Sequence, residues 1–448
     1  MEDKHLLIVG AGLVGSLLGL RLLQRGYKVS LLELRPDLRS SSQSAGRSIN
    51  LALSHRGLRG LELVGLRDKA MELSVKMRER MIHSSAGQLM GLAYSAREGE
   101  YINSISRKAL NCMLMDAIDQ LDPKALQFES KLLDWNPQQQ SVQWADQNGI
   151  VHKLDNVILL GTDGANSQCR KLLMEQSQKL RFNYSQSYQN YGYKELTLPP
   201  GPGGEFLIKK EALHIWPRGH FMMIALPNPD ASFTCTLFFP YRGEDSFEIL
   251  DQPDLRKEFF DRHFSDMADY FEIFNEEYEK NPIGHLYTVK CSPWSYEDKM
   301  LLMGDAAHAI IPFYGQGMNC GFEDVVIFDE MLNQNKNWLS CFQSFEKARK
   351  INSDAIADLA EDNFLEMRDR VADLDFQKKR TLEIKLEKEF SDYFSKYSLV
   401  TFRPDVSYHD AMQLGRKQDE YLLQVVNNEK DIDSINPLIL IEQLRALR

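Results

Sequence analysis

This chain of 448 residues lacks the features by which membrane, exported and nucleic-acid-binding proteins are identified from sequence. It has no apolar run of about 18 residues, the length that spans a bilayer. Its first apolar strand begins at once, without the charged segment and long apolar core of an export signal. The net charge of −11 leaves no basic field for a phosphate backbone. We therefore expect a cytoplasmic protein without nucleic acid or a transmembrane anchor.

Cysteine is scarce as well. The six cysteines form no C-x-x-C motif and no close pair, which argues against zinc, iron–sulfur clusters and a disulfide framework. We expect reduced thiols and no metal. Internal repeats and low-complexity segments are missing, and the 43% hydrophobic residues are enough for the cores of two or three domains.

The N-terminal segment carries the pattern of a dinucleotide-binding loop. An apolar strand over residues 6–9 is followed by glycines at G-x-G-x-x-G spacing, namely Gly10, Gly12 and Gly15. These glycines permit a tight turn, a close approach of pyrophosphate to the backbone, and close packing of helix on strand. A helical pattern covers residues 16–25, and we assign Leu13 and Val14, at the positive end of the helix, to the cofactor site. An ordinary strand–helix turn with chance glycines is the alternative.

A second strand, over residues 28–33, ends in Glu33. A carboxylate at this position accepts both hydroxyl groups of an adenosine ribose and repels a 2′-phosphate, so the site should not hold NADP. We include the neighbouring Arg35 in the cofactor site.

Two further segments favour FAD over NAD. Residues 157–167 form a buried strand that ends in Asp163-Gly164, and residues 301–308 form a strand that ends in Gly304-Asp305 before a helix. A carboxylate beside the N–H groups of a helix start suits a sugar-phosphate chain. We assign His308 a packing or hydrogen-bonding role, because no nucleophile or carboxylate stands at a recognisable catalytic spacing from it.

The segment after the second of these strands, residues 311–321, contains a proline, glycines and a helix start. Its free N–H groups would stabilise the charge that reduced flavin carries near N1 and O2. Its candidate cofactor residues are Gly315, Gly317, Met318 and Asn319.

The glycine loop, Asp163-Gly164 and Gly304-Asp305 together resemble the single-component FAD-dependent aromatic monooxygenases, the para-hydroxybenzoate hydroxylase class. The resemblance implies an α/β fold: a Rossmann-like FAD-binding domain, a mostly antiparallel β-sheet substrate domain and a C-terminal helical region. It implies that Asp305 holds the ribityl chain and that the Asp163 segment helps bind FAD and NADPH. Arg107 matches an arginine near the flavin phosphates; by itself it is equally an exposed cation at a helix start.

The middle of the chain reads as successive antiparallel strands over residues 212–217, 221–227 and 232–239. Alternating apolar residues would form one face over the flavin ring or simply belong to the core; they are Leu213, Met222, Ile224, Leu226 and Phe238. Helical patterns cover residues 342–370, 376–397 and 437–448. We expect an FAD-binding domain over residues 1–75, 101–180 and 290–375, a substrate domain over 76–100 and 181–289, and a helical region over 376–448.

A more specific resemblance, to the kynurenine 3-monooxygenases, runs nearly end to end. It is carried by residues 76–84, Tyr94, and residues 213–217, 223–228, 312–319, 363–367 and 397–402. It implies that Arg80, Tyr94 and Asn363, with Tyr397 nearby, hold the amino-acid end of L-kynurenine. The chemistry fits, because a guanidinium can donate two parallel hydrogen bonds to a carboxylate, while a phenol and an amide complete the hydrogen bonds. Without the resemblance, Arg80 would read as a solvated member of a charge cluster. Two further substrate candidates are Pro312 and Phe313.

The implied activity is hydroxylation of L-kynurenine to 3-hydroxy-L-kynurenine with NADPH and O₂, through a flavin C4a-hydroperoxide, in tryptophan degradation. FAD would stay bound and NADPH would dock transiently, in a monomer or homodimer. The substrate's ring amine activates the neighbouring carbon, so we assign no catalytic acid or base. Two alternatives are a related FAD-dependent hydroxylase or epoxidase acting on another aromatic or lipid, and a non-catalytic flavin-fold protein that binds a partner.

Overall fold

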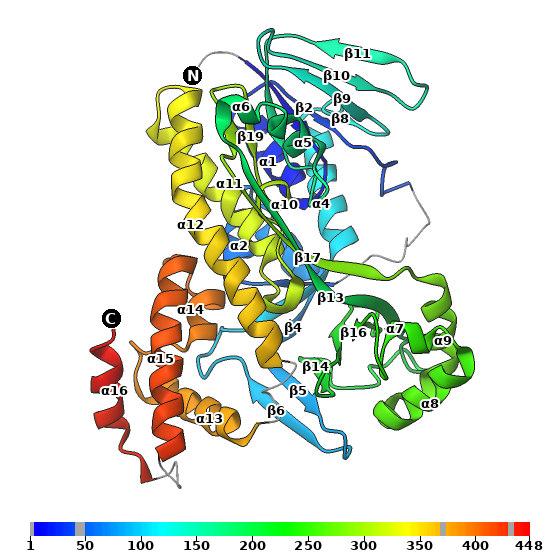
Figure 1. Ribbon diagram of the computed structural model, residues 1–448, viewed down its shortest axis with the longest axis vertical. Coiled ribbons are helices and arrows are strands. Elements are labelled where there is room, and N and C mark those ends of the chain that lie inside the picture. The colour runs from blue at the N-terminus through cyan, green and yellow to red at the C-terminus, as the bar shows by residue number, and fades with distance from the viewer. Residues whose placement is uncertain (1–3, 41–49, 368–372, 429–433) are drawn as a thin grey trace. The chain divides into compact units, whose positions relative to one another are not determined.

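The computed structural model describes residues 4–40, 50–367, 373–428 and 434–448 (Figure 1). The chain divides into two compact units. The first unit contains residues 1–73, 105–188 and 287–357, and the second contains residues 74–104, 189–286 and 358–448. Residues 376–448, expected to form a helical region, lie in the second unit together with residues 358–375.

The first unit is built on a six-stranded sheet in the order β18-β19-β12-β1-β2-β8. Its strands are β1 (His5–Val9), β2 (Val29–Leu32), β8 (Leu126–Gln127), β12 (Val157–Gly161), β18 (Ser295–Tyr296) and β19 (Met300–Leu302). All neighbouring strands are parallel except β18 and β19. In the register, Val9 pairs with Leu32 and Gly161, and Gly161 pairs with Leu302. The segments that follow these four strands therefore emerge at one edge, where parallel sheets bind ligands.

Helices and a small antiparallel sheet complete the first unit. The sheet has the order β11-β10-β9, from β9 (Lys131–Asn136), β10 (Ser141–Ala145) and β11 (Val151–Leu154). Strand β3 (Asn50–Leu53) also lies in this unit, and the helices are α1 (Leu13–Gln24), α2 (His55–Leu63), α3 (Arg67–Glu72), α4 (Arg107–Leu121), α5 (Gln168–Met174), α6 (Ser177–Leu180), α10 (Asp305–His308), η2 (Pro312–Tyr314) and α11 (Gly317–Gln334). The buried apolar strands of the six-stranded sheet and the inner faces of α1, α4 and α11 share one core.

The second unit contains most of a seven-stranded sheet in the order β17-β13-β16-β15-β14-β5-β6. Residues 183–188 and 287–292 of this sheet belong to the first unit. The strands of this sheet are β5 (Glu79–His83), β6 (Leu89–Ala93), β13 (Asn183–Leu198), β14 (Ala212–Pro217), β15 (Met222–Pro227), β16 (Phe233–Pro240) and β17 (Gly284–Ser292). The three predicted middle strands are present with nearly the predicted bounds. One face packs on α7 (Phe247–Leu250), α8 (Pro253–His263), η1 (Ser265–Tyr270) and α9 (Phe271–Lys280) through a phenylalanine-rich core. The short strands β4 (Ser74–Met77) and β7 (Ile102–Ser106) precede and follow the β5–β6 hairpin.

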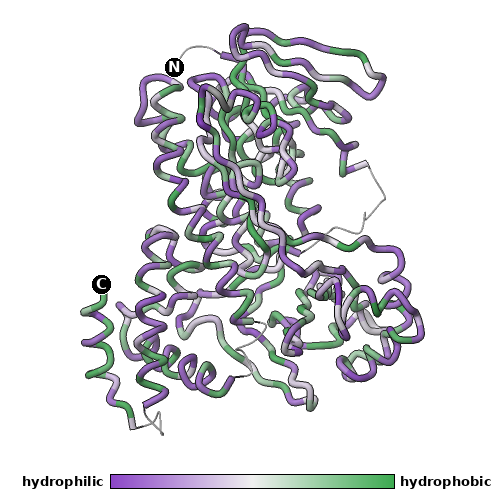
Figure 2. The backbone as a smooth tube through the Cα atoms, viewed as in Figure 1, coloured by the Kyte–Doolittle hydropathy of each residue, from purple (hydrophilic) through white to green (hydrophobic). Residues whose placement is uncertain are grey.

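The C-terminal part of the chain is helical. It contains α12 (Trp338–Leu365), which begins in the first unit, and then α13 (Leu374–Glu389), α14 (Lys396–Phe402), α15 (Tyr408–Asn428) and α16 (Pro437–Arg445). The apolar faces of α13, α15 and α16 share a separate core, and hydropathy alternates along α15 accordingly (Figure 2). Within the described ranges, no helix is both long and apolar enough to traverse a bilayer.

Candidate active site

The glycine loop between β1 and α1 has the shape of a phosphate cradle. Gly10 has a φ of +96°, and a Cβ there would lie 2.7 Å from the Asp163 Cα. A Cβ on Gly15 would collide with the Gly10 carbonyl oxygen, whereas no atom lies within 4 Å of the position of a Cβ on Gly12. Helix α1 starts at Leu13 without a side-chain cap. The cap residue therefore offers its first N–H groups no side-chain acceptor, which leaves them available to an FAD pyrophosphate.

Glu33 is fixed beside this loop. Its carboxylate accepts hydrogen bonds from the Ala11 backbone N–H at 2.9 Å and from the Arg35 Nε at 2.8 Å. The Ala11 carbonyl in turn accepts a bond from the Asn111 Nδ2 at 3.0 Å. Arg107 lies one turn before Asn111 on α4 and is exposed. Asn111 belongs to no motif, and sequence reasoning missed it.

The two motif aspartates stand in different environments. Asp163 accepts hydrogen bonds from the Ser167 hydroxyl at 2.5 Å and from the backbone N–H groups of Gln168 and Cys169 at 2.6 and 3.0 Å, so it caps α5. Asp305 is the exposed first residue of α10, and its carboxylate accepts no hydrogen bond from the described residues. Asp305 is therefore the carboxylate available to a ribityl chain, while a contact of Asp163 with FAD stays a prediction.

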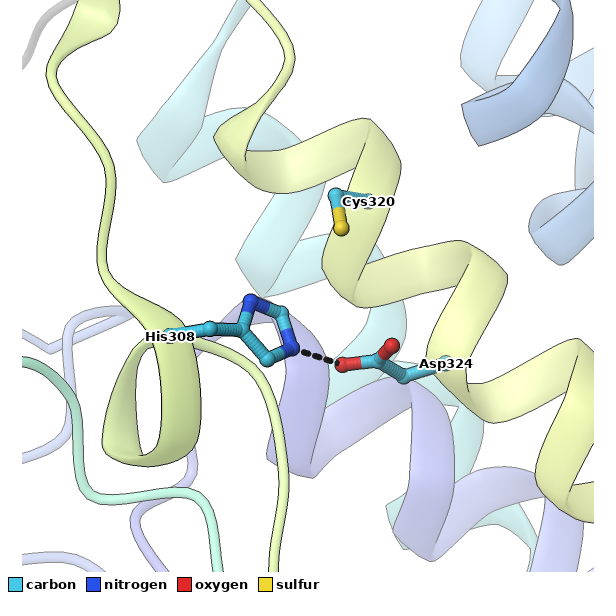
Figure 3. Close-up of side chains that lie close together, drawn as sticks. All are labelled: His308, Cys320 and Asp324. Carbon is cyan, nitrogen blue, oxygen red and sulfur yellow. Dashed lines mark hydrogen bonds and ion pairs between the residues drawn. The ribbon is translucent and has the colours of Figure 1, made fainter. Parts of the chain in front are cut away.

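A buried ionic network supports the turn that presents Asp305. Asp324, on α11, accepts hydrogen bonds from the Gly304 N–H at 3.0 Å and from the His308 Nε2 at 2.6 Å (Figure 3). Arg349, on α12, donates to the other Asp324 oxygen at 2.7 Å and to Glu323 at 2.5 Å. His308 thus has the hydrogen-bonding role expected of it. The network itself links residues far apart in sequence, and no sequence signal indicated it.

His308, Asp324 and Cys320 lie close enough together to be considered as metal ligands (Figure 3). The Arg349 guanidinium, however, lies 3.3 Å from the Cys320 sulfur and 2.7 Å from Asp324. Burial raises the pKa of the Cys320 thiol well above its ordinary value, which keeps it protonated. A guanidinium already provides the positive charge that the carboxylate needs, so this cluster is an ion-pair network.

The loop before α11 has the conformation expected of a flavin-ring contact. Gly315 has a φ of +66°, and α11 begins at Gly317 without a side-chain cap. The amide of Asn319 donates to the carbonyls of Ala52 and Gly315, both at 2.8 Å, and accepts from the Ser54 N–H at 3.0 Å. The Asn319 side chain therefore fixes the loop, while contact of the backbone N–H groups of Gly317, Met318 and Asn319 with the cofactor stays a prediction. In the same loop, Pro312 is exposed and Phe313 is buried.

In the second unit, three predicted substrate residues come together. The rings of Tyr94 and Tyr397 stack with their centroids 5.4 Å apart and an interplanar angle of 13°. The Arg80 guanidinium lies 4.4 Å from the Tyr397 ring centroid and 5.4 Å from that of Tyr94. Asn363 is buried near the end of α12, where its Nδ2 lies 3.2 Å from the Met367 sulfur. Two tyrosine rings therefore frame one arginine.

This arginine forms no close pair with a carboxylate of the described residues, although the charge of Glu366 acts on it. Arg80 forms no ion pair within the described ranges, and its buried Nε has no hydrogen-bond partner. The buried Tyr94 hydroxyl also has none. Burial and the neighbouring Tyr397 raise the pKa of Tyr94 well above its ordinary value, against the effect of Arg80, so the phenol remains a neutral donor. A buried guanidinium N–H group and a buried phenol hydroxyl, both without a hydrogen-bond partner, fit a carboxylate ligand, because unpaired polar groups are costly to bury.

The sheet places the predicted apolar residues on the same face as Arg80. Strand pairing joins Leu213 to Arg80, Ile215 to Ile224, and Met222 to Phe238. Directly paired residues share a face and alternate residues return to it. The predicted set of Leu213, Met222, Ile224, Leu226 and Phe238 therefore lies on the face opposite the phenylalanine-rich core. Contact of this face with an aromatic substrate stays a prediction.

Comparison with known proteins identifies the family. The FAD binding domain family matches residues 3–334. The kynurenine 3-monooxygenase of Myxococcus xanthus is 44% identical over 414 residues, which cover 92% of this chain and 88% of the relative. The chain belongs to the kynurenine 3-monooxygenase family. Relatives of the same name from Christiangramia forsetii and Dictyostelium discoideum are 41% and 40% identical over 95% and 99% of this chain, and 94% and 97% of their own lengths.

Solved structures share the fold of this kynurenine 3-monooxygenase family member. A 2-methyl-3-hydroxypyridine-5-carboxylic acid oxygenase aligns with a TM-score of 0.68 at 18% identity, over 91% of this chain and 100% of its own. PqsL of Pseudomonas aeruginosa, a probable FAD-dependent monooxygenase, aligns with a TM-score of 0.64 at 17% identity, over 82% of this chain and 98% of its own. The predicted family, fold class and FAD cofactor are thus confirmed.

Replacing Asp305 with alanine is expected to weaken FAD binding in this family member by about 1.5–3 kcal/mol, the cost of losing hydrogen bonds to a charged group. Fluorescence titration of the apoprotein with FAD measures the change. Asp134→Ala serves as the matched control, because Asp134 is exposed on β9, a strand of the small antiparallel sheet that belongs to no cofactor loop. Equal FAD affinity of the Asp305→Ala variant and the parent would remove Asp305 from the site.

Proposed function

We propose that this protein hydroxylates L-kynurenine to 3-hydroxy-L-kynurenine, with bound FAD, NADPH as reductant and O₂ as oxygen source. The observation that carries the proposal is the Arg80 guanidinium, which lies over two stacked tyrosine rings and forms no ion pair with a carboxylate in the described part of the chain. The relatives at 40–44% identity bear the name of this activity. We further propose a cytoplasmic location, supported by six free cysteines, five of them buried.

The substrate would be held through its amino-acid end. Arg80 forms a forked pair with the α-carboxylate, which supplies a closely paired counterion. Tyr94 donates its hydroxyl hydrogen to the same group, and Asn363 provides further amide hydrogen bonds. Strong and directional contacts at this end fix the position of the aromatic ring, and accurate positioning accounts for much of the rate gain in such a reaction.

The aromatic end needs an apolar environment. The sheet face that carries Met222, Ile224, Leu226 and Phe238 provides it. Exclusion of water by such a surface protects a reactive oxygen donor from wasteful breakdown.

The first unit would hold the cofactor. The glycine loop and the start of α1 take the pyrophosphate, Glu33 takes the adenosine ribose, and Asp305 takes the ribityl chain. The N–H groups at the start of α11 stabilise negative charge on the reduced ring. FAD supplies electron transfer from NADPH and oxygen transfer to the aromatic ring. The amino group of the substrate activates the ring carbon beside it, so no side chain acts as acid or base.

A single-turnover experiment tests the proposal. The oxidised holoenzyme is mixed anaerobically with NADPH, with and without L-kynurenine, and flavin absorbance is followed before O₂ is admitted. We expect L-kynurenine to accelerate flavin reduction and chromatography to show 3-hydroxy-L-kynurenine. Hydrogen peroxide without a phenol would refute the assignment, hydroxylation of a different aromatic or a lipid would indicate a related hydroxylase, and a colourless protein would indicate a partner-binding role.

A further inference from the structure

The first part of β13 presents an ordered aromatic surface. Tyr184, Gln186 and Tyr188 alternate along the strand and so share one face. The Tyr184 hydroxyl donates to the Gln186 Oε1 at 2.6 Å, and the Gln186 Nε2 donates to the Tyr188 hydroxyl at 3.0 Å. Even so, Tyr184 is 37% and Tyr188 62% exposed. Two aromatic residues are thus held in place at their polar ends while much of their surface remains in solvent.

This surface is tied to the loops that hold the cofactor. The Arg170 guanidinium lies 5.1 Å from the Tyr184 ring centroid and donates to the carbonyl of Ala306, next to Asp305, at 2.8 Å. Its Nη2 donates to the carbonyl of Ala165, two residues after Asp163, at 2.5 Å. One buried arginine therefore fixes Tyr184 to the loops that follow β12 and β19.

Tyr188 is anchored to the same region through a second contact. Its ring centroid lies 5.0 Å from that of Tyr287, on β17. The Tyr287 hydroxyl donates to the Asn166 Oδ1, in the loop after β12, at 3.4 Å. Both exposed rings are therefore held next to the edge at which the sheet binds its cofactor.

The chemistry of the reaction demands a site of this kind. A nicotinamide cosubstrate has to bind, yet the sequence contains one G-x-G-x-x-G loop, and FAD fills it. Purine and pyridine rings stack on exposed aromatic side chains whatever their substituents. Lys179 and Arg181, which precede β13, are exposed and form no ion pair in the described part of the chain, so positive charge is available for phosphate groups.

We propose that Tyr184 and Tyr188 form a stacking platform for the transiently bound pyridine nucleotide. The proposal rests on the proposed function, because it assumes that this nucleotide reduces the flavin. It gives the cosubstrate a docking surface in the first unit that is separate from the glycine loop.

The test uses the holoenzyme and anaerobic stopped-flow reduction at varied NADPH concentration. We expect Tyr188→Ala to raise the half-saturating NADPH concentration about tenfold, which is what the loss of one stacking contact implies. Tyr188→Phe should stay within about twofold, because the ring is retained. Val151→Ala, at a similarly exposed apolar residue on β11, serves as the matched control and should match the parent.

Three measurements distinguish a loss of NADPH binding from a general loss of structure in the variant. Bound FAD, reduction of the flavin by dithionite, and the KM for L-kynurenine should all be unchanged in Tyr188→Ala. An unchanged NADPH dependence would overturn the proposal, and so would a loss of FAD or a parallel rise in the KM for L-kynurenine. Because flavin reduction by NADPH is measured without following any product, the platform can be refuted while hydroxylation stands, and the reverse also holds.

Discussion

Arg80→Ala is expected to raise the KM for L-kynurenine by roughly 30-fold or more, while FAD stays bound. Truncating one partner of a buried, hydrogen-bonded charge pair costs about 2–5 kcal/mol, and each 1.4 kcal/mol or so corresponds to a factor of ten in affinity. The substrate carboxylate would then meet two tyrosine rings and no cation. Steady-state kinetics at saturating NADPH measures the change.

The same variant should not lose thermal stability. In the free protein Arg80 forms no ion pair with any described residue, and its buried Nε has no hydrogen-bond partner, so its removal relieves a cost rather than breaking an ion pair. Arg78→Ala is the matched control, because Arg78 lies two residues away, forms an exposed pair with Glu211 at 3.3 Å and should change the KM little. An unaltered KM in Arg80→Ala, or a large fall in its melting temperature, would contradict the assigned role. Arg80→Lys retains the charge without the fork and should fall between the parent and Arg80→Ala.

The strands and the glycine loop were predictable because their signals are local. Alternation predicted strands at residues 212–217 and 221–227, which the structure has at 212–217 and 222–227, and the glycine spacing predicted the turn after β1. Helix α1 begins at Leu13 and not at residue 16, because the loop glycine Gly12 serves as its N-cap without a side chain. The pattern over residues 376–397 was interpreted as one helix, but α13 ends at Glu389 and α14 begins at Lys396. Ser395 caps α14, since its side chain accepts the Ser398 N–H at 3.3 Å, and this local signal was overlooked.

The candidate site was predictable only where a resemblance supplied the roles. Arg78 and Arg80 look alike in the sequence, yet Arg78 is an exposed surface cation, whereas Arg80 has its Nε buried and its guanidinium over two tyrosine rings. Burial of that kind depends on the pairing of β5 with β14, which are more than a hundred residues apart along the chain. The support of Asp305 by Asp324 and Arg349 depends on the packing of α12 against α11, and no local pattern encodes it.

Arg349→Met is expected to lower the unfolding free energy of the first unit by about 3–5 kcal/mol, the usual cost of leaving a buried charge without its partner. Arg349 is 2% exposed and donates to both Glu323 and Asp324. Its loss leaves Arg56 and His308 to neutralise two buried carboxylates. Since Asp324 also holds the Gly304 N–H, the variant should release FAD more readily on dilution. Chemical denaturation and the fluorescence of released FAD measure the two effects.

The size of this effect depends on the burial of the arginine, as an exposed arginine in the same unit shows by comparison. Arg59→Met removes a cation on α2 that pairs with Glu330 on α11 at 2.7 Å. Both side chains are 39% exposed, and the substitution should cost at most about 1 kcal/mol. Burial by itself would raise the pKa of both carboxyl groups. Arg349 and Arg56 nevertheless hold the pKa of Glu323 below its ordinary value of 4.5. His308 and Arg349 likewise hold the pKa of Asp324 below its ordinary value of 3.8. A carboxyl group whose pKa is lowered in the folded state stabilises the fold at any pH above its ordinary pKa. This stabilisation is lost as the pH falls through the lowered pKa. Below about pH 4, the unfolding free energy of Arg349→Met should therefore fall less steeply with decreasing pH than that of the parent. An equally steep dependence in the variant would show that the network does not stabilise this unit. A stability loss no larger than that of Arg59→Met would show the same.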